Sequence, residues 1–260
     1  MIKNTNLKES FRKRKLMFGS WTSIGDHQIA EIFSKSEIDF LGIDIEHSSI
    51  SYKDAQNIIL AAHSSKVPCL PRIATLNKES IKRLLDLGAD GLIVPNVETK
   101  SEVDQIIEWM KYPPLGKRGY GISQAQGYGF DFNTYSGDWN KKSTLIIQIE
   151  SITAVENLES LIVNDEIDAV MIGPYDISGS LGVPGEIYNN EVKKACKKVL
   201  DICKKFNKSC GIQDIEPNEK SIKNNINLGY NFIVLASDVF VLWKWTEKIN
   251  NLIKSIDKNT

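Results

Sequence analysis

The sequence has few cysteines, and none of them stands in the spacing that binds zinc. Its four cysteines, Cys69, Cys196, Cys203 and Cys210, form no CxxC pair, which disfavours zinc binding and dithiol redox chemistry. Cys196 and Cys203 are two helical turns apart, about 10 Å along a helix axis, which is too far for a disulfide. Free thiols in a chain without an export signal favour the cytoplasm as its location.

The chain also lacks long apolar runs and an excess of charge of either sign. The net charge of −1 gives no electrostatic reason to expect a nucleic-acid or anionic-membrane partner. Every apolar run is shorter than the ~20 residues that cross a bilayer. The one basic run, at 12–15, precedes only three apolar residues. We therefore interpret it as a solvated lead-in to the first strand and not as a signal peptide.

Apolar runs typical of buried parallel strands alternate with stretches of helical periodicity. Strands are expected at 16–22, 40–45, 67–73, 91–94, 145–149, 169–172, 209–213 and 232–236. Helices are expected at 26–35, 51–64, 77–88, 100–111, 152–162, 189–206, 216–228 and 238–256. Eight such repeats without a linker predict one (β/α)8 barrel domain over 1–260. A doubly wound open sheet is the alternative, weakened because no GxGxxG or P-loop follows any strand.

One segment, 115–142, interrupts this alternation and is expected to be irregular. It is rich in Gly, Ser and Asn, and irregular stretches of this length are often lids or binding loops. Its six aromatic residues need a surface to pack on, which argues against a disordered excursion. A second irregular loop is expected after Asp176, where three glycines leave backbone N–H groups accessible to a carboxylate.

Two carboxylates end the fifth and sixth expected strands. Glu150 follows the strand at 145–149, and Asp176 follows the strand at 169–172. Neighbouring parallel strands end at the same rim, so both acids are expected there. Oxygen ligands with few other partners suit a hard divalent ion that keeps positions open for substrate. The alternative is that both acids are helix caps or loop carboxylates.

The other strand ends add a histidine and an arginine but no lysine. His47 ends the second expected strand and Arg72 the third, while the absence of a lysine disfavours a Schiff-base enzyme. Each has a structural alternative: His47 could cap the next helix, and Arg72 could pair with Glu46. Asp44 lies within the second strand and is expected to point into the barrel. Carboxylates, an imidazole and a guanidinium at the same rim of the barrel nevertheless favour an active site.

Several motifs, in order, resemble the class II pyruvate aldolases. This is the 2-keto-3-deoxy-acid group, which includes the 4-hydroxy-2-oxoheptanedioate and 2-dehydro-3-deoxyglucarate aldolases. The motifs are IDIEH at 43–47, PRI at 71–73, LLDLG at 84–88, YPPLGKRG at 112–119, QIE at 148–150 and GPYD at 173–176. The resemblance runs from about residue 18 to the end of the chain. It implies a barrel of the phosphoenolpyruvate/pyruvate-binding type.

The resemblance also implies how pyruvate would be held. Glu150 and Asp176 would bind a divalent metal, Mg²⁺, Mn²⁺ or Co²⁺. Pyruvate would chelate that metal through its keto and carboxylate oxygens. Gln148 and the backbone at Tyr175 and Asp176 would complete the substrate pocket.

The same resemblance assigns the proton-transfer groups. His47 would be the base, acting directly or through a metal-bound water, and Asp86 would raise its basicity. Arg72 would stabilise the enolate oxygen. These roles agree with elementary chemistry, because a Lewis acid and a fixed guanidinium both lower the energy of an enolate. Asp86 is expected at the end of a helix, away from the rim, so it would have to act through a neighbouring subunit or be only a helix-end residue.

Three features depart from the family pattern. Tyr175 replaces a smaller residue, Ile45 replaces an expected glycine, and the 115–142 segment agrees with the family only at its start. These departures leave the pyruvate half of the site intact and leave the acceptor aldehyde unassigned.

The last expected helix carries apolar residues on more than one face. Its main stripe is Val239, Leu242, Ile249, Leu252 and Ile256, and three further aromatic residues spread beyond it. A helix of this kind has more than one partner. The resemblance implies a homo-oligomer, a hexamer, in which this helix is exchanged between subunits. The alternative is a helix pressed on its own barrel.

Together these features predict an enzyme, a metal-dependent aldolase that reversibly joins pyruvate to an aldehyde. The product would be a 2-keto-3-deoxy or 4-hydroxy-2-keto acid. Two alternatives remain: other enolate chemistry at the same site, such as oxaloacetate decarboxylation or acyl-CoA lysis, and a catalytically silent barrel that binds a keto acid.

Overall fold

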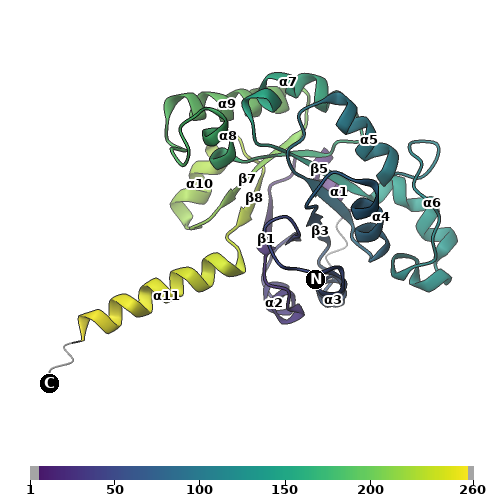
Figure 1. Ribbon diagram of the computed structural model, residues 1–260, viewed down its shortest axis with the longest axis horizontal. Helices are drawn as coiled ribbons and strands as arrows, with labels where there is room; N and C mark the ends of the chain where they lie inside the picture. Colours follow the sequence, from purple (N-terminus) through teal and green to yellow (C-terminus); the bar gives the residue numbers. More distant parts are fainter. Residues whose placement is uncertain (1–5, 257–260) are drawn as a thin grey trace.

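Eight parallel strands close into a barrel in chain order in the computed structural model, which describes residues 6–256 (Figure 1). The strands are β1 (Met17–Thr22), β2 (Phe40–Asp44), β3 (Cys69–Arg72), β4 (Gly91–Val94), β5 (Thr144–Ile149), β6 (Ala169–Ile172), β7 (Ser209–Asp214) and β8 (Phe232–Leu235). Each strand pairs with its neighbour in sequence, and β1 closes the barrel against β8, with Gly19 opposite Val234. The predicted (β/α)8 barrel is confirmed, and the doubly wound alternative is excluded.

Helices follow the strands as the periodicity predicted, with ends that shift by a few residues. They are α2 (His27–Phe33), α3 (Tyr52–Ser64), α4 (Lys78–Asp86), α5 (Lys100–Met110), α7 (Ile152–Ile162), α9 (Asn190–Lys205), α10 (Glu219–Leu228) and α11 (Asp238–Ser255). Polar caps fix many of the starts: Ser51 and Asp54 form a capping box on α3, and Thr99 and Glu102 form one on α5. No helix within residues 6–256 is long and apolar enough to cross a membrane.

The segment at 115–142 is more regular than expected. It contains a 3₁₀ helix, η1 (Gln124–Gly129), and an α-helix, α6 (Phe132–Lys142), so the prediction of an irregular stretch is wrong for its second half. The sequence of α6 is poor in strong helix formers, which is why the periodicity missed it. Packing stabilises it instead, because Trp139 is buried and its indole N–H donates to the Met110 carbonyl at 2.8 Å.

The expected loop after Asp176 also contains a helix. α8 (Pro174–Ser180) begins on a proline, which is favourable in a first helical turn, and Asp176 lies within that turn. Gly179 is therefore helical, while Gly182 and Gly185 lie in the following loop with positive φ. The prediction of a fully irregular, glycine-lined loop is corrected accordingly.

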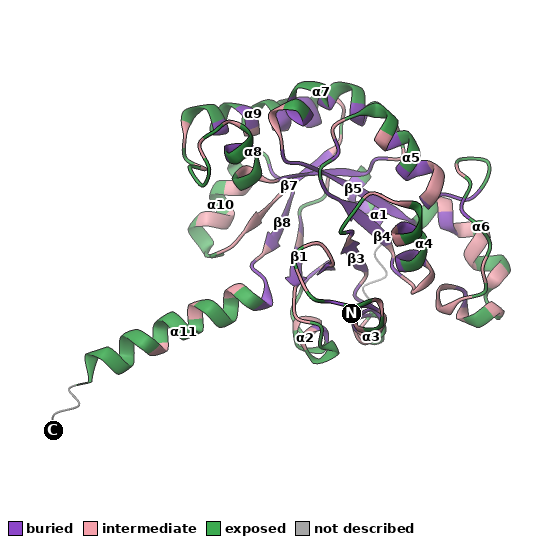
Figure 2. Ribbon diagram, viewed as in Figure 1, coloured by how far each residue is buried: buried purple, intermediate pink, exposed green. Residues whose placement is uncertain are grey.

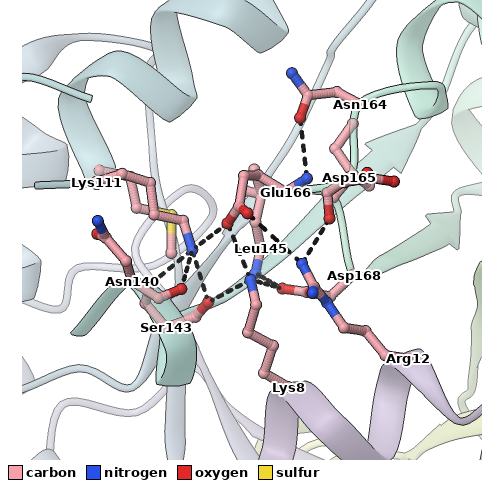
Figure 3. Close-up of polar contacts among 12 residues, drawn as sticks. Lys8, Arg12, Lys111, Asn140, Ser143, Leu145, Asn164, Asp165, Glu166 and Asp168 are labelled. Carbon is pink, nitrogen blue, oxygen red and sulfur yellow. Dashed lines mark hydrogen bonds and ion pairs between the residues drawn. The ribbon is translucent and has the colours of Figure 1, made fainter. Parts of the chain in front are cut away.

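A short helix that the sequence did not predict closes the bottom of the barrel, the end at which the strands begin. α1 (Leu7–Arg12) buries Phe11, whose ring meets Phe232 edge-on at 5.2 Å. Two basic side chains of α1 reach a cluster of ion pairs (Figure 3). Lys8 lies 3.2 Å from Asp168, and Arg12 donates to the same carboxylate at 2.8 Å. The interpretation of 12–15 as a merely solvated lead-in is therefore wrong for Arg12.

The same cluster joins α1 to two other parts of the barrel bottom. Lys111, at the end of α5, is 2.9 Å from Glu166 and donates to the Ser143 carbonyl at 3.0 Å. Lys8 also donates to Glu166 at 3.1 Å. Burial and the neighbouring Lys8 ammonium lower the pKa of Lys111 to about 8. We refer to Lys8, Arg12, Lys111, Glu166 and Asp168 as the basal cluster.

The last helix, α11, extends away from the barrel into solvent (Figures 1 and 2). Its first two turns are anchored: Asp238 accepts from the Thr22 hydroxyl at 2.7 Å and from the Ser23 N–H at 2.9 Å, and Lys244 pairs with Glu216. Its exposed apolar side chains are Val239, Val241, Leu242, Trp243, Trp245, Leu252 and Ile253. Every side chain of neighbouring α10 is likewise at least partly exposed. The alternative of a last helix pressed on its own barrel is excluded.

Candidate active site

Glu150 and Asp176 converge at the C-terminal rim of the barrel, over Gly173. Glu150 directly follows β5, and Asp176 lies in the first turn of α8, just after β6. A methyl group on Gly173 would lie 2.8 Å from Glu150 Cγ and 2.9 Å from Asp176 Oδ2. The absence of a side chain at 173 therefore lets the two carboxylates approach. Neither is the N-cap of its helix, since Ser151 caps α7 and Gly173 precedes α8.

Both oxygens of Glu150 accept hydrogen bonds. The Asn96 backbone N–H donates to Oε2 at 2.8 Å, and the Gln148 amide donates to Oε1 at 3.2 Å. Burial raises the pKa of Glu150 to about 7, helped by the nearby carboxylates of Asp176 and Glu46 and opposed by the Asn96 hydrogen bond. A buried carboxyl group with a raised pKa would be stabilised in its charged form by a cation that takes the place of its proton.

Arg72 is held between two carboxylates of the second strand–helix unit. Its guanidinium lies 2.9 Å from Asp44 Oδ1 through Nη2 and 3.2 Å from Glu46 Oε2 through Nε. It also lies over the Trp21 ring, 5.0 Å from the ring centre. The predicted pairing of Arg72 with Glu46 is present, and so is the buried, inward position of Asp44. These contacts fix the guanidinium beside the cavity that Glu150 and Asp176 line.

Glu46 Oε2 is ion-paired with Arg72 but accepts no hydrogen bond from the residues that the structure describes. Among residues 6–256, no donor makes a hydrogen bond to buried Glu46 Oε2, and the same is true of Gln148 Oε1. Burial raises the pKa of Glu46, against the opposing effect of the Arg72 charge. These two oxygens at one rim can accept a hydrogen bond from a ligand or from water.

His47 stands at the edge of this group. Its side chain is 70% exposed, and its Nε2 lies 3.7 Å from Glu46 Oε2. Its backbone N–H donates to Asp44 at 3.1 Å, while Ser51 caps α3. The imidazole is therefore free of a capping role and lies exposed beside Glu46.

A cavity of about 1120 Å³ opens beside the rim. Arg72, Gln148, Glu150 and Asp176 line one end of it, with half-exposed Tyr175 at the mouth. The other end continues between α9 and α10 as far as Tyr230. Five of the seven predicted site residues therefore line this cavity, namely Arg72, Gln148, Glu150, Tyr175 and Asp176. His47 lies at the same rim, beside Glu46 and outside the cavity lining.

Asp86 is the one predicted site residue that lies away from this rim. It ends α4, and a helix that follows a parallel strand ends at the opposite face of the barrel. There it pairs with buried Arg118, whose Nη2 lies 2.8 Å from its Oδ1. The Arg118 guanidinium also lies over the rings of Tyr112 and Trp139. Within one chain, Asp86 therefore anchors the 112–142 segment.

The donor set at the rim fits a divalent ion with an open coordination sphere. Within residues 6–256, no group of three or more His, Cys, Asp or Glu side chains could hold a metal. The two carboxylates that converge here would leave further positions to water and substrate oxygens, as a hard ion such as Mg²⁺ or Mn²⁺ accepts. The raised pKa of Glu150 agrees with this, since a cation would stabilise its charged form.

Two structural residues of the site could not be singled out from the sequence. In the sequence, Gly173 looks like an ordinary residue at the start of a helix. Its importance is evident only from the structure, where Glu150 and Asp176 lie against it. Asn96 follows the expected strand at 91–94, and only the fold shows that its N–H donates to Glu150. The sequence signal for both is their position within two residues of a strand end.

Comparison with known proteins gives the same family. The family model described as HpcH/HpaI aldolase/citrate lyase matches residues 17–244. The hydroxypyruvate/pyruvate aldolase of Roseobacter denitrificans is 30% identical over 90% of this chain and 91% of its own. The 2-keto-3-deoxy-L-rhamnonate aldolase of Salmonella typhi is 30% identical over 96% of this chain and 93% of its own.

Solved structures agree. An HpcH/HpaI aldolase/citrate lyase family protein from Burkholderia cenocepacia superposes with a TM-score of 0.89 at 27% identity, covering 96% of this chain and all of that one. The predicted membership of the pyruvate aldolase group is thereby confirmed. The chain belongs to the HpcH/HpaI aldolase/citrate lyase family.

Proposed function

We propose that the protein is a divalent-metal-dependent aldolase that reversibly cleaves a 4-hydroxy-2-keto or 2-keto-3-deoxy acid to pyruvate and an aldehyde. One observation carries the proposal: in a chain of an aldolase family, Glu150 and Asp176 converge beside a fixed guanidinium at the rim of the barrel. Relatives named as aldolases of hydroxypyruvate and of 2-keto-3-deoxy-L-rhamnonate support pyruvate as the shared half of the substrate. The free cysteines favour the cytoplasm as its location.

The residues of the rim divide the work of enolate chemistry. Glu150 and Asp176 would hold Mg²⁺, Mn²⁺ or Co²⁺, which when bound supplies a Lewis acid to the keto group. Arg72, fixed by Asp44 and Glu46, offers its charge to the enolate oxygen without having to reorganise. Gln148 and the backbone at Tyr175 and Asp176 would orient the pyruvate.

His47 is the proposed proton carrier. Its imidazole is exposed at the rim and lies beside Glu46, so it can reach a substrate from the solvent side. Imidazole suits proton transfer near neutral pH, either from the pyruvate methyl group or from the C4 hydroxyl in the cleavage direction. Tyr175, half-exposed at the cavity mouth, would face the aldehyde side.

Exchange of the pyruvate methyl protons in D₂O, followed by NMR, tests enolate formation without knowledge of the aldehyde. We expect exchange with Mg²⁺, Mn²⁺ or Co²⁺, none with chelator, and loss of exchange in His47→Ala and Asp176→Ala. His63→Ala, at the opposite end of α3, and Asp104→Asn, exposed on α5, are matched controls that should exchange normally. Failure of the folded protein to exchange with any of these ions would overturn the proposal. Oxaloacetate decarboxylation and acyl-CoA lysis would then be tested next.

We further propose that α11 is exchanged between copies in a homo-oligomer, a hexamer as the family resemblance implies. The exposed apolar side chains of α11 support this, since they need a partner to leave water. Leu242→Lys together with Trp243→Lys should reduce the mass measured by light scattering. Lys254→Leu, at the helix end, should leave it unchanged.

In such an assembly Asp86 could act on His47 of another subunit. Co-expression of Asp86→Asn with His47→Ala tests this, because a hybrid oligomer would contain some sites with both groups intact. Recovery of exchange activity in the hybrid supports the role. Activity no greater than that of the separate variants would leave Asp86 as the anchor of Arg118 alone.

A further inference from the structure

Asn96 adopts a backbone conformation that few side chains tolerate. It follows β4 and Pro95 at the rim, with a φ of 54°, in the left-handed region. Asparagine enters this region more readily than other non-glycine residues, and β-branched residues enter it least. A non-glycine residue held there at a rim that carries the proposed chemistry calls for a functional explanation.

This conformation directs the Asn96 N–H at the proposed metal ligand. The N–H donates to Glu150 Oε2 at 2.8 Å, which is an optimal distance for a charge-assisted hydrogen bond. The Asn96 side chain instead reaches Glu46 Oε1, at a longer 3.4 Å and in an exposed position. The backbone contact is thus the stronger of the two and the one directed at the metal ligand.

Glu150 needs such a constraint because its surroundings repel it. The carboxylates of Asp176 and Glu46 lie close enough to disfavour its charged form, so a free side chain would turn away from Asp176. Gln148 holds only Oε1, and at 3.2 Å. The Asn96 N–H restrains the other oxygen, so the carboxylate is oriented before an ion arrives.

We propose that Asn96 is a positioning residue for the metal site, acting through its left-handed backbone and not through its side chain. The proposal rests on the proposed function, in which Glu150 is a metal ligand. Removing the side chain without changing the backbone should therefore be harmless, whereas a residue that resists positive φ should displace the N–H and weaken metal binding.

Calorimetric titration of the metal-free protein with Mn²⁺ at pH 8 tests the proposal. Asn96→Gly keeps the conformation and the N–H, so its Mn²⁺ dissociation constant should stay within about threefold of the parent value. Asn96→Val should raise it by about tenfold or more, as loss of an outer contact to a ligand does. Asn207→Val is the matched control: Asn207 has the same φ of 54°, is exposed after α9, and should affect stability only.

The outcomes separate the two proposals. A parent protein that does not bind Mn²⁺ refutes the proposed function, and with it the role of Asn96. Normal Mn²⁺ affinity in Asn96→Val, or an equal loss in Asn96→Gly, would overturn the positioning role alone. If Asn96→Val does not fold, as judged by circular dichroism, Asn96→Ala takes its place with the same comparison against Asn96→Gly.

Discussion

Metal affinity should fall steeply below pH 7 because Glu150 binds a proton that the metal must displace. Burial and neighbouring carboxylates raise the pKa of Glu150 to about 7, against an ordinary value of 4.5. A metal ligand must be deprotonated, so each pH unit below that pKa weakens apparent binding tenfold. Relative to the plateau above pH 8, the Mn²⁺ dissociation constant should rise about tenfold at pH 6 and about a hundredfold at pH 5. An ordinary glutamate would leave the constant almost unchanged at pH 6.

Calorimetry provides two independent readings of this effect. The dissociation constant gives the pH profile, and titration in buffers of different ionisation enthalpy gives the number of protons released on binding. About one proton should be released at pH 6 and almost none at pH 8. In Glu46→Gln, removal of a neighbouring carboxylate should move the break in the profile to lower pH. A dissociation constant that stays flat from pH 8 to pH 5.5 would refute the reasoning.

Three further predictions concern stability and packing. In the metal-free protein, the raised pKa of Glu150 stabilises the folded state at low pH, and this stabilisation is lost as the pH rises from about 4.5 to about 7. The free energy of unfolding, measured in urea at a series of pH values, should therefore fall by up to about 3 kcal/mol across this range, and Glu150→Gln should abolish that fall. Asp168→Ala should lower the free energy of unfolding by about 3–5 kcal/mol because it removes the fully buried carboxylate that pairs with both Lys8 and Arg12, and Glu166 is then their one remaining acidic partner in the basal cluster. Lys13→Ala at an exposed pair should change it little, and equal effects would contradict the assignment. Gly173→Ala should weaken Mn²⁺ binding by about tenfold or more, while Gly179→Ala, with open space around it, should bind normally; normal binding in Gly173→Ala would show that the carboxylates can move aside.

The barrel was predictable because its signals are local. Each strand is a short apolar run such as β4, and each helix carries its own periodicity and caps, so alternation alone gave the architecture. The rim positions of Glu150, Asp176, His47 and Arg72 followed from that alternation, since parallel strands end at one face. The family motifs then supplied roles that periodicity could not.

What escaped prediction depends on contacts between distant parts of the chain. α1 is too short for a periodic signal. Lys8 has a structural role only because it pairs with Asp168, which lies far along the sequence (Figure 3). α6 is held by the burial of Trp139 and not by helix propensity. The pairing of Asp86 with Arg118 likewise appears only once the 112–142 segment is packed.

Without the proposed ion the rim is electrostatically unfavourable, and this explains how its charged residues depend on one another. Burial is the main reason why the pKa values of Glu46 and Glu150 are raised, and repulsion between the neighbouring carboxylates, Asp176 included, adds to it. Arg72 offsets part of the repulsion on one side, and the Asn96 N–H offsets part of it on the other. A bound cation would relieve the remainder, so affinity for the ion arises as much from the repulsion it removes as from the contacts it gains. By this reasoning, neutralising Glu150 or Asp176 should stabilise the metal-free fold above pH 7 while it weakens the metal complex.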